Sequence, residues 1–178
     1  MLISGRLRAI SLCSLLAALY VVLLFLFQSL SFLPIQVRVA DMLIPTSIIY
    51  GWPATIGVTL GVVFGNFLSP FGLTDIIVGA FANLFAASIG QIFGKGSDNP
   101  KRFFFIALLQ NLAITIMIGS YLWLISAPLP EALYEIGLHP LLLNLLAIFF
   151  GSFVAINVLG VVLVAELSKL DKKKVKLI

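Results

Sequence analysis

Long apolar stretches separated by short polar or turn-forming breaks run through the whole chain. Gly, Pro and charged residues divide the sequence into six such stretches, and a helix needs about 20 apolar residues to cross about 30 Å of hydrocarbon. The pattern predicts an all-α integral membrane bundle of six transmembrane helices, forming a single transmembrane domain over residues 1–178. The predicted spans are 9–27, 39–50, 54–68, 73–93, 103–126 and 141–167.

The second and third spans are shorter than a straight membrane-crossing helix. A helix that ends inside the membrane leaves backbone groups without partners, which is tolerated where other protein or a water-filled cavity satisfies them. We therefore expect these spans to be tilted, extended through their flanks or ended part-way, with a cavity nearby. The residues that bound them are Pro34, Gly51-Trp52-Pro53 and Ser69-Pro70.

The composition is not that of a soluble protein, and the positions of Lys and Arg predict how the chain is oriented in the membrane. The chain is 61% hydrophobic and 10% charged, with a mean hydropathy of +1.18, whereas soluble domains are about 25% charged. Lys and Arg collect in cytosolic loops. Arg6 and Arg8 precede the first span, Lys95 lies between the fourth and fifth, and a basic tail follows the sixth. These positions predict cytosolic N and C termini in a multi-pass protein of the cell membrane.

Several classes of function lack the residues they need. The only histidine, His139, lies in a predicted outer loop, and the single Cys13 offers no spacing for a metal site. Gly94-Lys95-Gly96-Ser97 lacks the strand that precedes a phosphate-binding loop. The basic residues have no interleaved aromatic platform, so they predict contact with the lipid bilayer and no nucleic acid. We expect no metal, no cofactor, no ATP hydrolysis and no enzyme activity.

Charged side chains within the spans mark the first candidate site. Arg38 and Asp41 begin the second span and Asp75 begins the fourth, so all three lie near the outer ends of their helices. A charge within the bilayer is costly and usually pairs with another or serves a polar pathway. Arg38 and Asp41, three positions apart, share a helical face and can pair. A purely structural pair and a ligand-binding role are equally compatible with this pattern.

Amides add to this outer cluster. Asn66, Asn83, Asn111, Asn144 and Asn157 lie in apolar helices, where an amide hydrogen-bonds either another helix or a ligand. Carboxylates and amides near the outer face could accept hydrogen bonds from the donor edge of a polar heterocycle, with nearby phenylalanines as a stacking wall. The cluster comprises Gln36, Arg38, Asp41, Asn66, Ser69 and Asp75, and the nearby aromatic residues are Phe32, Phe67 and Phe71.

A strip of small residues follows the first span. Cys13 and Ala17, and likewise Ser14 and Ala18, are four positions apart and lie on neighbouring faces of one helix. Small residues let another helix approach closely. The strip therefore predicts either internal packing or, if it faces outward, a docking surface for a partner.

Two sequence motifs stand out in the first half of the chain. The first runs from Gln36 to Asp41 and is followed by Pro45, and the second combines Gly65-Asn66-Phe67-Leu68-Ser69-Pro70 with Asp75-Ile76-Ile77-Val78-Gly79. Together they resemble the QueT family, the substrate-binding S components of energy-coupling-factor (ECF) uptake transporters assigned to queuosine precursors. Order, spacing and hydropathy match over nearly the whole chain. Asn111 and the stretch around Gly151 resemble later family motifs.

The resemblance implies a six-helix S component with an outward-facing pocket for a small-molecule substrate. It also implies docking of the first helix on a transmembrane coupling subunit that two ATPase subunits drive. In a pocket for a deazaguanine-like base, Asp41 would accept from ligand N–H groups and Arg38 would orient Asp41 or meet the ligand carbonyl. Asn66, Asp75 and Asn111 would complete the contacts.

Two departures from the family bear on the ligand. Ala40-Asp41 stands where the family usually has Ser-Glu, and Gly151-Ser152 where it usually has Gly-Glu. Another vitamin or nucleobase is therefore the alternative substrate. A structural or assembly membrane protein without a small-molecule ligand is the alternative of a different class, and an intramembrane enzyme is a distant third.

Overall fold

The structure is a computed structural model that describes residues 2–31, 37–94, 99–125, 127, 129, 130, 133, 135 and 137–175. Over these residues the regular elements are all helices, which confirms the predicted all-α class. In chain order they are α1 (Leu2–Leu26), α2 (Gln28–Ser31), the 3-10 helix η1 (Val39–Thr46), α3 (Ser47–Tyr50), α4 (Trp52–Gly65), the 3-10 turn η2 (Asn66–Leu68), α5 (Leu73–Gly94), α6 (Pro100–Leu124), α8 (Pro140–Ser152), the π-helical η3 (Phe153–Gly160) and α9 (Val161–Val175).

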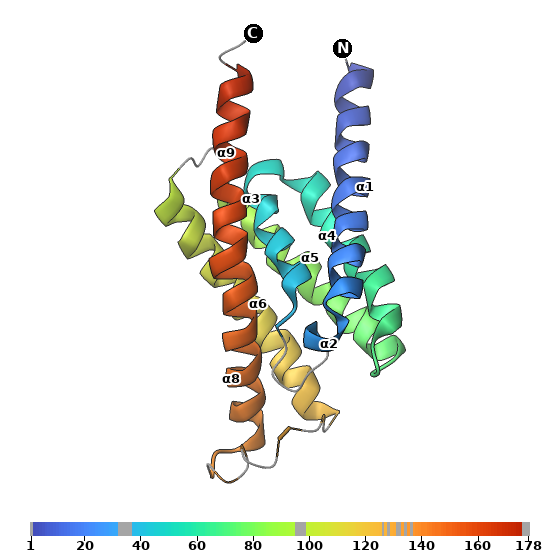
Figure 1. The fold of residues 1–178 in the computed structure, drawn as a ribbon, viewed down its shortest axis with the longest axis vertical. Helices are drawn as coiled ribbons and strands as arrows, with labels where there is room; N and C mark the ends of the chain where they lie inside the picture. The colour runs from blue at the N-terminus through green and yellow to red at the C-terminus, as the bar shows by residue number, and fades with distance from the viewer. Residues whose placement is uncertain are drawn as a thin grey trace.

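The helices form an elongated bundle in which α1 and α9 extend to the same end, so both chain termini lie there (Figure 1). The helical segment made of η1 and α3 lies between α1 and the long rod formed by α8, η3 and α9. α4 packs against α1, and α5 packs against both α4 and α6. Helical residues cover most of each predicted apolar stretch, with η1 and α3 in the second and α8, η3 and α9 in the sixth.

Four helical segments of the described chain are long and apolar enough to cross a membrane: Gly5–Leu26, Gly72–Gly94, Pro100–Leu124 and Pro140–Leu170. The segments Val39–Tyr50 and Trp52–Leu68 are apolar but shorter, as the sequence predicted. A kinked or non-α backbone at such depth needs surrounding protein. Consistent with this, η1 packs against α1, α5 and η3.

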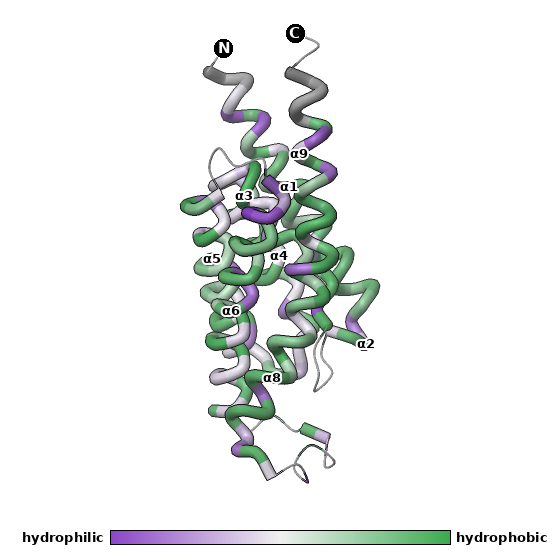
Figure 2. The backbone as a smooth tube through the Cα atoms, turned by 90° about the vertical axis from the view of Figure 1, so that its left-hand side faces the viewer, coloured by the Kyte–Doolittle hydropathy of each residue, from purple (hydrophilic) through white to green (hydrophobic). Residues whose placement is uncertain are grey.

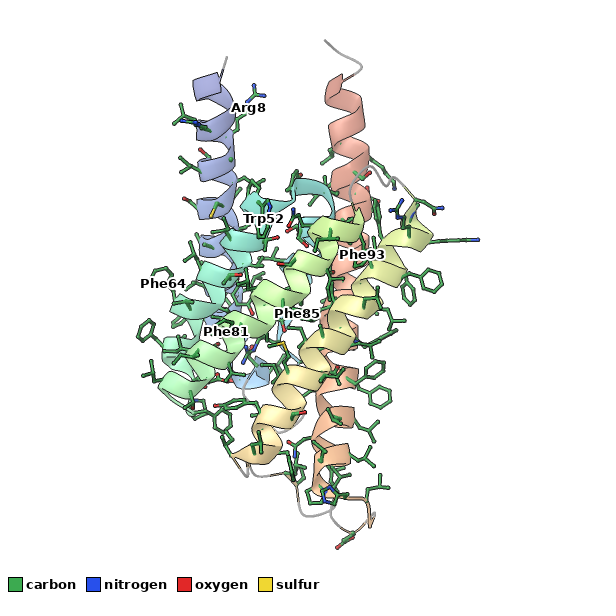
Figure 3. All side chains as sticks on the ribbon, turned by 180° about the vertical axis from the view of Figure 1, so that it is seen from behind. Arg8, Trp52, Phe64, Phe81, Phe85 and Phe93 are labelled. Carbon is green, nitrogen blue, oxygen red and sulfur yellow. The ribbon has the colours of Figure 1, made fainter. Side chains whose placement is uncertain are left out.

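Most residues along the middle of the bundle are apolar, and hydrophilic residues are frequent in α1 and α9 toward the end where the termini lie (Figure 2). Phe64, Phe81, Phe85 and Phe93 project away from α4 and α5, with 58%, 62%, 57% and 53% of their side chains exposed (Figure 3). Exposing so large an apolar surface to water is unfavourable, whereas exposing it to hydrocarbon is not. The surface is therefore that of a membrane protein.

The second helical segment has an unusual backbone that fits its sequence. Pro45 lies inside the 3-10 helix η1, where it cannot donate a backbone hydrogen bond. Gly51 ends α3 with φ 60°, a conformation that favours glycine, and Pro53 lies in the first turn of α4. This sharp reversal places η1 and α4 next to each other with Asp41 on the inner side of the bundle, 4% exposed.

The contact between α1 and α4 depends on glycines four positions apart on α4. A Cβ at Gly57 would lie 2.7 Å from the backbone oxygen of Cys13, and one at Gly61 would lie 2.5 Å from the Cβ of Tyr20. Small residues at such spacing allow two helix backbones to approach closely in a membrane. α1 is thus held along one face. Only 17% of the apolar stretch within its membrane span, Gly5–Leu26, is buried inside the bundle.

This packing predicts that Gly61→Ala destabilises the protein by about 1–3 kcal/mol, because a Cβ there has no space and the two backbones must separate. Thermal unfolding in detergent measures the effect. Gly5→Ala is the matched control, since Gly5 lies in α1 with nothing within 4 Å of the added Cβ. Equal melting temperatures for Gly61→Ala and the wild type would contradict the close packing of α1 on α4.

Candidate functional site

Charged side chains from two elements meet inside the bundle. Arg38 precedes η1 and Asp75 lies in the first turn of α5, and their Nη2 and Oδ2 atoms are 3.9 Å apart. Arg38 is 7% exposed and Asp75 2% exposed. Buried ions of opposite sign compensate part of each other's desolvation, so this pair accounts for a cation and an anion inside an apolar bundle.

Asp41 brings a second carboxylate to the same region. Its backbone N–H donates to the carbonyl of Arg38 at 2.9 Å, which starts the 3-10 helix, and residues three apart in such a helix share one face. The Tyr20 hydroxyl, from α1, donates to Asp41 Oδ1 at 2.5 Å. Tyr20 is fully buried, so three elements contribute to the cluster: α1, η1 and α5.

Asn66 borders Asp75 and carries a free acceptor. Its Nδ2 donates to the backbone carbonyl of Asp75 at 2.9 Å, and a Cβ at Gly79 would lie 2.6 Å from that nitrogen. Among the described atoms, Asn66 Oδ1 is buried without a hydrogen-bond partner, and Asp75 Oδ2 has the ion pair with Arg38 but no hydrogen bond. Buried polar atoms are nearly always hydrogen-bonded in proteins, so these acceptors indicate a missing donor, such as water or a ligand.

A small cavity opens beside Arg38 and Asp41. Asn83 of α5 and Ser152 of α8 add polar groups to its wall, and isoleucines from α6 and α8 form the apolar side. Its volume is about 10 Å³, roughly the space of one water molecule. A heterocycle would require the surrounding segments to separate. The apolar side consists of Ile114, Ile118 and Ile148.

The predicted site residues divide into four groups in the structure, of which the last is Asn111 alone. Arg38, Asp41, Asn66 and Asp75 lie in the buried cluster. Ser69 is partly buried, and its Oγ accepts from the backbone N–H of Phe71 within a local turn. Gln36 lies outside the described residues, as does Phe32.

Asn111 lies on α6, three and seven positions before the isoleucines of the cavity wall, and therefore on the same helical face. It is fully buried, its Oδ1 accepts from Thr115 at 3.4 Å, and its Nδ2 has no partner among the described atoms. It does not itself line the cavity. Phe67 does not form the expected stacking wall, because it is 71% exposed and does not line the cavity.

Tyr20 was not predicted as a site residue from the sequence. A tyrosine within an otherwise apolar span is the sequence feature that could have indicated it, because a buried phenol usually has a hydrogen-bond partner. The structure identifies that partner as Asp41. Asn83 and Ser152 line the cavity. The sequence indicated a contact to another helix or to a ligand for Asn83, and it marked Ser152 only as a departure from the family motif.

Another buried amide connects helices instead of facing the cavity. Gln110 of α6 donates to Ser47 Oγ at 3.1 Å and to the carbonyl of Ala86 at 3.0 Å. A Cβ at Gly90 would collide with the same amide nitrogen, so the glycine makes room for this contact. Gln110 therefore joins α6 to α3 and α5.

The residues of the small-residue strip of α1 lie in two different environments. Cys13 and Ala17 pack toward α4, near Gly57 and Gly61, whereas Ser14 and Ala18 are exposed. An apolar groove of about 330 Å³ runs between α1 and the start of α4. Its lining includes Ile10, Cys13, Ser14, Trp52 and Ile56.

The apolar exterior, the spanning helices and the buried polar cluster define a helical membrane protein with polar groups gathered inside the bundle. The sequence model of the family described as QueT transporter matches residues 10–169, so the chain belongs to the QueT transporter family. This confirms the resemblance recognised in the sequence. Comparison with curated proteins and with solved structures gives no match.

Proposed function

We propose that the protein is the substrate-binding S component of an ECF-type uptake transporter, and that it binds a deazaguanine-like queuosine precursor. The observation that carries the proposal is the buried cluster of Arg38, Asp41 and Asp75 beside a cavity, in a chain of the QueT transporter family. Charges inside a membrane bundle are costly, and binding a polar ligand is a reason to keep them there.

The chemistry of the cluster suits a ligand with several N–H donors. With both carboxylates ionised, the three groups sum to one negative charge, and Asn66 Oδ1 and Asp75 Oδ2 are buried acceptors without a hydrogen bond among the described atoms. The amino and ring N–H groups of a deazaguanine would donate to Asp41 and Asp75. Arg38 would donate to its carbonyl, and the isoleucines would cover its faces.

The cavity must enlarge to admit such a base. Pockets for small organic ligands have volumes of about 300–1,000 Å³, whereas the cavity beside Arg38 and Asp41 has a volume of about 10 Å³. We therefore propose that binding separates η1 from α6 and α8, three of the elements whose side chains line the cavity. The π-helical η3, which packs against η1, lies where such a rearrangement would occur.

A different vitamin or nucleobase is the second candidate ligand. Ser152 lines the cavity at the position where the family usually has a carboxylate, so this site presents one anion fewer than the family pattern. Asp41 likewise has a shorter stem than the usual Glu. A ligand with fewer donors or a bulkier edge would suit these differences, and a ligand panel separates the two candidates.

We further propose a topology of six spans in one transmembrane domain, with both termini in the cytosol and the protein in the cell membrane. Two observations support this topology. α1 and α9 extend to the same end of the bundle, and basic residues lie near that end, namely Arg6, Arg8 and Lys169. A transmembrane coupling subunit, driven by two ATPase subunits, would dock on α1. The exposed Ser14 and Ala18 and the neighbouring apolar groove support that position.

Thermal unfolding of the purified chain against deazaguanines, purines and vitamins tests the proposal. A ligand that binds only the folded state adds about 2.7 kcal/mol at 100 times its Kd. We expect a selective rise in melting temperature with a deazaguanine. A rise with another compound would change the substrate and keep the transporter, whereas no rise in a well-folded sample would favour a structural or assembly role.

A further inference from the structure

Tyr20 connects the first helix to the buried carboxylates. It belongs to α1, the helix held mainly along the face that packs on α4, yet its hydroxyl reaches η1. Its side chain is 0% exposed. A phenol so deep in an apolar bundle needs a polar partner, and here the partner is a side chain of the proposed binding site.

The ring of Tyr20 has little freedom to move. A Cβ at Gly61 would lie 2.5 Å from the Cβ and 2.8 Å from the Cγ of Tyr20, so the base of the side chain lies directly against the backbone of α4. Side chains in such close-packed surroundings keep one rotamer. The position of the hydroxyl is therefore set by the α1–α4 contact.

The hydroxyl in turn orients Asp41. The 2.5 Å distance from the Tyr20 hydroxyl to Asp41 Oδ1 is that of a charge-assisted O–H···O⁻ hydrogen bond, which is stronger than a bond between neutral groups. Holding one carboxylate oxygen fixes the plane of the carboxylate. Asp41 lines the cavity, so its remaining acceptor capacity is presented there in one orientation.

We propose that Tyr20 is a positioning residue for the ligand: it holds Asp41 in the orientation that accepts hydrogen bonds from the donor edge of the base. This inference rests on the proposed function, because it assumes that Asp41 contacts the ligand. Tyr20 does not line the cavity and acts through Asp41. Preorganised acceptors bind better than mobile ones because less ordering accompanies binding.

The test is a double-mutant cycle on the affinity for 7-deazaguanine, measured by titration calorimetry with Tyr20→Phe, Asp41→Asn and the double variant. Phe keeps the ring and its packing on Gly61. We expect Tyr20→Phe to weaken binding about tenfold in the wild type and less than about twofold in the Asp41→Asn background, because the phenol acts through the carboxylate. Equal losses in both backgrounds, or none in either, would overturn the inference.

Ligand selectivity gives a readout that a general loss of packing would not move. The wild type should prefer 7-deazaguanine over 7-deazahypoxanthine, which lacks the 2-amino donor, and Tyr20→Phe should reduce that preference about tenfold. A proportionate weakening of both ligands would overturn the positioning role. Phe keeps the ring that packs on Gly61, and the melting temperature of Tyr20→Phe shows that the variant is folded before the two affinities are compared.

Tyr121→Phe is the matched control. Tyr121 is also buried, at 8% exposed, and its hydroxyl lies 3.0 Å from Thr74 Oγ1 instead of Asp41. It should leave the selectivity unchanged. A normal affinity in Asp41→Asn would contradict the site assignment itself, whereas a weakened Asp41→Asn with a normal Tyr20→Phe would overturn only the role of Tyr20.

Discussion

Replacing Asp41 by Asn should weaken the binding of a deazaguanine about 100-fold. The isosteric amide removes the charge and turns one acceptor into a donor that faces the ligand's own donors. Hydrogen bonds to charged groups contribute about 1.5–3 kcal/mol, and each 1.4 kcal/mol is a factor of ten in Kd. Titration calorimetry on the detergent-purified protein measures the change.

Gln110→Met is the control for this variant. Gln110 is fully buried and hydrogen-bonded, but it joins helices and does not line the cavity. We expect it to lower the melting temperature without changing the affinity. If Asp41→Asn bound as tightly as the wild type, or if both variants lost affinity equally, Asp41 would not be a ligand contact.

Replacing Arg38 by Met should destabilise the empty protein by about 3–5 kcal/mol, the usual cost of removing one member of a buried ion pair. Met retains an unbranched apolar stem, so the effect reports the loss of the guanidinium, with its charge and its hydrogen-bond donors. Two carboxylates, Asp41 and Asp75, then remain in the bundle without the cation that lies 3.9 Å from Asp75. Chemical unfolding in detergent measures the loss.

A second substitution separates charge from packing. Arg38→Met/Asp75→Asn returns the cluster to one formal negative charge, so it should recover much of the lost stability. Glu166→Gln is the matched control, because it breaks the exposed ion pair with Lys169, whose side chains are 63% and 66% exposed, and should cost less than about 1 kcal/mol. A wild-type stability for Arg38→Met would show that the buried pair is not needed for folding.

The helices were predictable because the signals that bound them are local. Gly51 and Pro53 mark the reversal before α4, and long apolar runs mark the spans. The 3-10 conformation of η1 was not predicted. It depends on Pro45 and on the close approach of η3, where a Cβ at Gly160 would lie 3.0 Å from the Met42 carbonyl oxygen. That contact joins segments far apart in the chain.

The sequence predicted most residues of the candidate site from their type and position, but it predicted only some of their interaction partners. Spacing placed Arg38 and Asp41 on one face, but the ion pair with Asp75 and the bond from Tyr20 to Asp41 join separate helices. Local periodicity carries no information on such pairs. It also failed for Phe67, because in a membrane an aromatic residue is equally soluble on the lipid side and in the interior.

The central claim is that the cluster of Arg38, Asp41 and Asp75 is the place where this member of the QueT transporter family binds its ligand. Equilibrium dialysis with 7-deazaguanine tests it most directly, on the wild type and on Arg38→Met/Asp75→Asn, which keeps the net charge of the cluster. We predict saturable binding of one ligand per wild-type chain and none to the folded double variant. Equal binding to both proteins, or none to a well-folded wild type, would contradict the claim.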